Sequence, residues 1–259
     1  MQSVVLVLLG GVIGAYGTLI GAGGGFLLVP LLLFMDPLSS PSAVTGISLS
    51  IVAANALSGS LAYARKRRID YHVAIALGLA SIPGTVIGAL LTASIPRRSF
   101  EALFGVLMLA LALLILWRPV RPATPSAAPL ETGVPPTPAP GCLYVGLPAS
   151  FLVGLVSGAM GIGGSPLQVV VLTHLMHVPV RTAMPTSQFM VLLSTVGGVL
   201  AHVFRHEFEP ELVTLLSLGA GALVGAQVGA ALSEQISGGV LVRLMALALV
   251  TVGVRLLWR

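Results

Sequence analysis

The sequence predicts an all-α, polytopic membrane protein of two homologous four-segment repeats, each with a first helix that is broken at glycines. Hydrophobic residues make up 56% of the 259 residues and charged residues only 8%, with a mean hydropathy of +1.03. Soluble domains carry about 25% charged residues, so this composition indicates helices that face a lipid bilayer. Eight apolar segments and a glycine run that occurs twice also favour this fold class. The net charge of +5 does not indicate a nucleic-acid partner.

The eight apolar segments are all long enough to cross the hydrocarbon core of a bilayer, which takes about 20 residues as helix. Trp117 and Trp258 close the fourth and the eighth segment, where aromatic residues are expected at the membrane interface. The N-terminus lacks a basic stretch, so we expect the first segment to be retained rather than cleaved as a signal peptide. The segments are approximately 3–35, 42–64, 71–93, 99–117, 143–176, 183–204, 212–232 and 240–258.

The first and fifth segments each contain a glycine run, Gly-Ala-Gly-Gly-Gly at residues 21–25 and Gly-Ile-Gly-Gly-Ser at residues 161–165. As continuous helix these segments would be about 50 Å long, against roughly 30 Å of hydrocarbon. Glycine disfavours helix by about 1 kcal/mol relative to alanine and tolerates left-handed backbone, so we predict a break at each run. The N–H groups that open the following helix would attract an anion. Close helix packing is the alternative role of these glycines.

The two halves of the chain are joined by a segment rich in proline, alanine and threonine. Such a composition neither forms a stable helix nor buries a face, so we predict an exposed, extended linker. The predicted organisation is an N-terminal transmembrane repeat at residues 1–117, the linker at 118–141 and a C-terminal transmembrane repeat at 142–259. The single cysteine, Cys142, excludes an intrachain disulfide.

Residues of the first half recur in the second half at offsets of 139 to 141 positions, which indicates a duplication with short insertions and deletions. Duplicated halves with interrupted helices at corresponding places are typical of secondary transporters, whose site lies where the repeats meet. The corresponding pairs include Gly14 and Gly154, Gly21 and Gly161, Ser48 and Ser187, Gly59 and Gly198, Gly84 and Gly225, and Gly88 and Gly229.

The orientation of the halves follows from how the glycine-bearing segments cross the membrane. If each crosses once, the halves are parallel; if each is a re-entrant hairpin, they are inverted. The distribution of lysine and arginine favours parallel halves, whereas inverted repeats are common in transporters, and both arrangements stay open. In either case the Arg-Lys-Arg-Arg cluster at residues 65–68 is expected on the cytoplasmic side.

Polar residues near the start of the second and sixth segments complete the candidate site. No cation lies at the centre of any span, so we expect recognition of an anion by neutral hydroxyl and amide donors together with the glycine N–H groups. Hydrogen bonding between helices is the alternative role of these polar side chains. The predicted substrate-binding residues are Gly23, Gly24, Gly25, Ser48, Asn55, Gly163, Gly164, Ser165, Thr186, Ser187 and Gln188.

An intramembrane serine hydrolase is a weaker reading of the polar residues. Ser157 or Ser165 could pair with His174 or His202, but no acid and no nucleophile turn accompanies them. His174 and His177 could share a metal ion, although an interfacial pair is the simpler interpretation. The prediction is therefore a protein without catalytic residues, metal site or cofactor.

At these residues the chain resembles the sulfite exporter TauE/SafE family of membrane permeases. Both halves carry the family's glycine-rich element followed by an apolar run, and residues 186–188 (Thr-Ser-Gln) match its Thr-Ser element; Ile47 departs from it in the first half. The similarity covers nearly the whole chain outside the linker. It implies a multi-pass protein of the bacterial cytoplasmic (inner) membrane that transports small sulfur-containing anions such as sulfite or sulfonates.

Other readings keep the fold and change the function. The substrate could be another small anion, such as a carboxylate, or a metal ion, or the protein could be a non-transporting scaffold. A ligand between the two glycine breaks would favour transport, whereas a dry, fully packed interface between the halves would favour a scaffold. The sequence leaves the transport direction, the coupling ion and the oligomeric state open, a homodimer included.

Overall fold

The computed structural model describes residues 2–21, 23–35, 40–117, 140–205, 212–233 and 235–258, and within them every regular element is a helix. The predicted all-α class is confirmed. The predicted linker lies outside the described residues except for its last two positions, where a helix has already begun. The N-terminal half contains α1 (Gln2–Leu19), α2 (Gly25–Met35), α3 (Pro41–Arg65), α4 (Tyr71–Thr92) and α5 (Arg97–Trp117).

The C-terminal half repeats this order of long and short helices. It contains α6 (Pro140–Met160), α7 (Ser165–Val170) continued by the π-helical turn η1 (Val171–Leu175), α8 (Val180–Phe204), α9 (Leu212–Leu232) and α10 (Gly238–Leu257). Seven helices are long and apolar enough to cross a membrane: α3, α4, α5, the part of α6 from residue 143, α8, α9 and α10. Of the eight predicted segments, the first and the fifth are therefore each divided in two.

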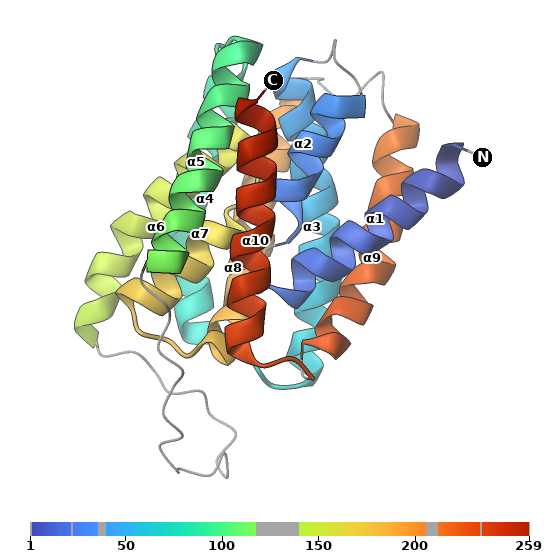
Figure 1. Cartoon of the computed structure of the whole chain (residues 1–259). Helices are drawn as coiled ribbons and strands as arrows, with labels where there is room; N and C mark the ends of the chain where they lie inside the picture. Colours follow the sequence, from blue (N-terminus) through green and yellow to red (C-terminus); the bar gives the residue numbers. More distant parts are fainter. Residues whose placement is uncertain are drawn as a thin grey trace.

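The divided segments are hairpins rather than bent spans (Figure 1). Helix α1 runs inward from one end of the bundle, and α2 returns toward the same end. Helix α6 enters from the opposite end, and α7 with η1 returns to it. This arrangement corresponds to re-entrant hairpins in inverted halves, and it differs from the parallel arrangement that the charge distribution favoured. The number of lysine and arginine residues assigned to each side of the membrane depends on how many times the chain crosses. Because the two hairpins reduce the number of crossings, this count did not predict the orientation of the halves.

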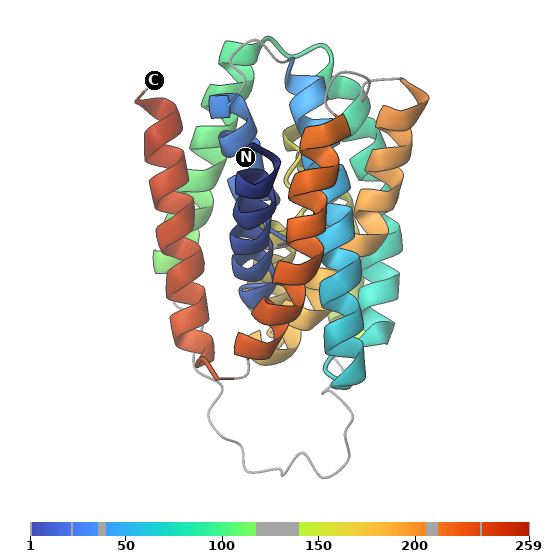
Figure 2. The ribbon, with the colours of Figure 1, turned by 90° about the vertical axis from the view of Figure 1, so that its right-hand side faces the viewer.

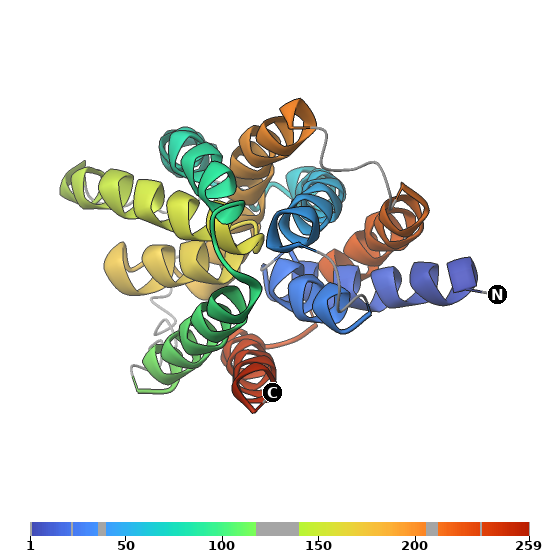
Figure 3. The same cartoon turned by 90° about the horizontal axis from the view of Figure 1, so that it is seen from above.

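The two halves interlock at the first and third segments of each half. Helix α1 packs along α9, and α6 packs along α4, so the first helix of each half lies against a helix of the other half (Figure 3). Small residues allow these contacts: a Cβ at Gly225 would overlap the backbone of α1, and a Cβ at Gly84 would overlap that of α6. Gly84 and Gly225 therefore allow close helix packing. Helices α5 and α10 lie beside each other on the outside.

The turn between α3 and α4 holds the basic cluster at residues 65–68, at the end of the bundle opposite to the turn between α4 and α5 (Figure 2). We expect a cysteine at Lys66, in a Cys142→Ser background, to resist a membrane-impermeant thiol reagent added to intact cells. A cysteine at Arg98 should react readily, because this exposed residue lies at the other end. Labelling at Lys66 with protection at Arg98 would reverse the proposed orientation.

Candidate functional site

Both glycine runs break their helices as predicted. The backbone takes left-handed φ angles at Gly21, Gly23 and Gly24 (68°, 62° and 83°), and again at Gly161, Gly163 and Gly164 (70°, 76° and 85°). These angles are costly for residues with a Cβ, which explains the choice of glycine. Helix α2 begins at Gly25 and α7 begins at Ser165, directly after each break.

The two breaks meet inside the bundle. A Cβ added at Gly25 would overlap the carbonyl of Ile162, so the backbones of the two breaks touch. Val52 of α3 lies against both, because its methyl groups would contact a Cβ at Gly25 or at Gly163. Gly24 is instead closed off by Ile13 of its own hairpin, and Gly164 by Ser157. The structure thus brings Gly25 and Gly163 together around one side chain of α3.

Ser48 and Ser187 each tie a helix to the break of the other half. The hydroxyl of Ser48 donates to the carbonyl oxygen of Gly161 at 2.7 Å, and the hydroxyl of Ser187 donates to that of Gly21 at 2.8 Å. Both serines are fully buried. In this conformation both serine hydroxyls donate to carbonyl oxygens of the breaks. Each serine therefore holds one break against a helix of the opposite half.

Asn55 is the centre of a buried polar cluster that joins four helices. Its Nδ2 group donates to the carbonyl oxygens of Gly14 in α1 (3.0 Å) and Ala222 in α9 (3.2 Å). Its Oδ1 atom accepts hydrogen bonds from the hydroxyl of Thr18 (2.9 Å) and from Nε2 of Gln188 in α8 (3.0 Å). Buried amides with complete hydrogen bonding stabilise helix contacts in an apolar medium.

The amide orientation of Gln188 follows from this cluster. Both Nδ2 contacts of Asn55 go to carbonyl oxygens, so its Oδ1 must be the acceptor, and Gln188 must turn its Nε2 toward it. The same Nε2 also donates to Thr18 Oγ1 at 3.3 Å. Gln188 Oε1 then lacks a hydrogen-bond partner in the described structure, although the residue is 0% exposed. The cluster of Thr18, Asn55 and Gln188 thus ends in one unsatisfied acceptor.

Of the remaining predicted residues, Thr186 lies apart from this cluster. Thr186 is buried, but its hydroxyl oxygen accepts a hydrogen bond from the backbone N–H of Asp70 at 3.2 Å, in the turn that precedes α4. The side chain of Ser165 lies outside the described residues. Thr186 therefore faces the end of the bundle that carries the basic cluster, whereas Asn55 and Gln188 lie deeper.

Thr18 was not among the residues predicted from the sequence, although its hydroxyl belongs to the cluster. Its backbone carbonyl oxygen accepts a hydrogen bond from the Tyr63 hydroxyl at 2.8 Å. The available signal was its place three residues before the first glycine run, on the inner end of α1. Gly59 was recognised only as a repeat position. A Cβ there would lie 2.8 Å from Gln188 Nε2, so glycine makes room for the amide.

The two histidines considered for a hydrolase each lie beside a threonine hydroxyl. The hydroxyl of Ser157 has no hydrogen-bond partner in the described structure. His174 Nδ1 lies 2.9 Å from the hydroxyl of Thr173, and His202 Nε2 lies 3.5 Å from the hydroxyl of Thr45. A search of the described residues finds no group of three or more His, Cys, Asp or Glu side chains placed to hold a metal ion.

Comparisons with known proteins agree with this architecture. Residues 6–256 match the model of the family described as "Sulfite exporter TauE/SafE". The chain is 31% identical to the probable membrane transporter protein YunE of Bacillus subtilis, over 100% of this chain and 98% of that protein. It is 28% identical to a probable membrane transporter protein of Xylella fastidiosa (strain 9a5c), over 96% and 93%. It is also 28% identical to YdhB of Bacillus subtilis, over 87% and 86%. No solved structure matches.

Proposed function

Because the chain belongs to the sulfite exporter TauE/SafE family, we propose that it carries a small sulfur-containing oxyanion, such as sulfite or a sulfonate, across a bacterial inner membrane. The proposed site lies where the two glycine breaks meet, beside the cluster of Thr18, Asn55 and Gln188. The relatives carry names of membrane transporters, which supports transport as the general activity. The choice of a sulfur-containing substrate is our extension of the family description.

The observation that carries the proposal is a buried polar cluster with an unsatisfied acceptor at the meeting of two helix breaks. A polar group buried without a partner costs about 1–3 kcal/mol, which a purely structural cluster would be expected to avoid. The cluster members are 0–1% exposed, so this conformation is closed. A scaffold would also be tightly packed, but alternating access equally requires a closed state, and the unpartnered Gln188 Oε1 favours a site that a ligand completes.

The hydrogen bonds of the cluster indicate what kind of anion fits. Every donor of Thr18, Asn55 and Gln188 is already used within the protein, and the free group is an acceptor. A fitting anion carries a proton donor of its own, such as the hydroxyl of hydrogen sulfite or the amino group of an aminosulfonate. Its negative charge is balanced by backbone N–H groups at the starts of the helices that follow the breaks.

The test is transport by the full chain in proteoliposomes. We expect uptake or efflux of sulfite or an aminosulfonate that exceeds that of acetate and of a sulfonate without a donor group. Ser187→Ala and Gln188→Ala should each reduce transport about 5- to 150-fold per folded protein, the equivalent of roughly 1–3 kcal/mol for one lost interaction. Gly163→Val should reduce it further, because it adds a branched side chain at a left-handed residue.

Two outcomes would contradict the proposal. Transport of none of these anions by folded wild-type protein would favour a scaffold. Transport that all three variants retain at the wild-type rate would move the site elsewhere. Gln227→Met serves as the matched control, because this amide joins α9 to α3 through Ser58 outside the cluster.

A further inference from the structure

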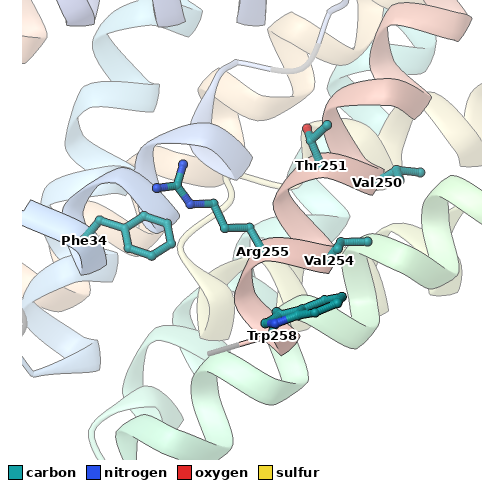
Figure 4. Close-up of a pocket in the computed structure, with 6 residues that line it drawn as sticks. All are labelled: Phe34, Val250, Thr251, Val254, Arg255 and Trp258. Carbon is teal, nitrogen blue, oxygen red and sulfur yellow. The ribbon is translucent and has the colours of Figure 1, made fainter.

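A groove lies between α10 and α2 (Figure 4), and its described lining includes no residue of the proposed transport site. Its wider part has a volume of about 630 Å³, within the range of small-molecule sites, and a second part of about 220 Å³ continues along α2 past Leu27, Pro30 and Leu31. Both parts share Phe34, Thr251 and Arg255. The wider part is lined by Phe34, Val250, Thr251, Val254, Arg255 and Trp258.

Among the described residues that line the groove, Arg255 is the only charged one. Its guanidinium carbon lies 4.5 Å from the centre of the Phe34 ring, a cation–π contact that orients the side chain across the groove (Figure 4). No carboxylate forms an ion pair with Arg255 in the part of the chain that the structure describes. The hydroxyl of Thr251 already donates to the carbonyl oxygen of Ala248 at 2.9 Å. The groove therefore combines one available positive charge with otherwise apolar walls.

The position of the groove along α10 points to the membrane interface. Trp258 is 88% exposed at the end of the helix, and tryptophan and arginine are the residues that anchor helix ends at the level of the lipid headgroups. From there the walls continue toward Val250, about two helical turns back along α10, and toward Leu27 on α2. An occupant with an anionic head at Arg255 and an apolar tail along α2 matches this order of side chains.

We propose that this groove binds an anionic phospholipid, with the phosphate on Arg255 and an acyl chain between α2 and α10. A free phosphate would leave the apolar walls unused, and a neutral lipid would leave the guanidinium without a counter-charge. Because α2 begins at Gly25, directly after the break, the bound lipid contacts the short helix that adjoins the meeting point of the two halves. This site does not depend on the identity of the transported substrate.

The test uses Trp258 as a local probe in a Trp117→Phe background, where it is the only tryptophan. The full chain is reconstituted in phosphatidylcholine with increasing fractions of acyl-brominated phosphatidylglycerol or acyl-brominated phosphatidylcholine. We expect the mole fraction that quenches half of the Trp258 fluorescence to be about five times lower for brominated phosphatidylglycerol than for brominated phosphatidylcholine. The attraction of one interfacial arginine for an anionic lipid accounts for a preference of this size. Arg255→Gln should remove the difference. Arg243→Gln, an exposed cation nearer the other end of α10, should keep it.

Equal quenching by the two lipids in the parent protein would overturn the proposal, as would a preference for phosphatidylglycerol that survives Arg255→Gln. Quenching by neither lipid, together with a disulfide-linked dimer through a cysteine at Val254, would assign the groove to a second copy of the chain and overturn it as well.

Discussion

Gly161→Ala should strongly reduce transport and lower the melting temperature by several degrees, and Gly21→Ala should do the same. Each glycine has a left-handed backbone, which costs alanine about 1–2 kcal/mol. Each also lies against backbone of the other half: a Cβ at Gly161 would lie 2.8 Å from Thr45 Cα, and one at Gly21 would lie 2.6 Å from Met184 Cα. Because backbone atoms cannot turn aside as a side chain can, the halves must separate locally, and we expect at least a tenfold loss of transport per folded protein.

The measurement is substrate flux in proteoliposomes, normalised to folded protein, with thermal unfolding of the same samples. Gly219→Ala is the matched control, because a Cβ there meets nothing within 4 Å, and it should keep transport and should not lower the melting temperature. Gly163→Ala separates the two causes. Its Cβ would meet a methyl group of Val52, so adding Val52→Ala should relieve the contact while the backbone cost remains. Normal flux in Gly161→Ala would mean that the break need not keep its shape during transport.

The length of the apolar segments and the density of glycine were sufficient to predict both breaks, because they depend on local backbone preference. Segment ends were predicted to within a few residues for the same reason: Asp70 caps α4 through its side chain, and Pro41 opens α3. The inversion of the halves was not predictable from the charge distribution, since a hairpin and a single span have the same composition.

The sequence was sufficient to predict that the polar side chains near the breaks are buried, but not which hydrogen bonds they form or that Thr18 joins them. Ser48, Ser187, Asn55 and Gln188 are all buried near the breaks, as expected for polar residues that avoid lipid. Which groups they bond depends on how α1, α3, α8 and α9 pack, and no local pattern encodes this. The sequence therefore suggested donors aimed at an anion, whereas the structure shows donors used on carbonyl oxygens and one acceptor left over.

The second large effect is expected at Asn55. Asn55→Leu keeps a similar volume but removes the side-chain donor to the carbonyl oxygens of Gly14 and Ala222, and it removes the acceptor for Thr18 and Gln188. Each buried group that loses its partner costs about 1–3 kcal/mol in soluble proteins and somewhat less in membranes. We expect a fall in thermal stability and at least a tenfold loss of transport, because Gln188 loses the contact that fixes its orientation.

A double-mutant cycle with Gln188→Met distinguishes a shared cluster from two independent helix contacts. Because Gln188 Nε2 donates to Asn55 Oδ1, the double variant should lose less stability than the sum of the two single variants, by about 0.5–3 kcal/mol. Gln227→Met, which breaks a matched amide contact to Ser58, should add independently and keep transport. Additive losses for Asn55 and Gln188, or a loss of transport in Gln227→Met as large as in Asn55→Leu, would show that the cluster only holds helices together.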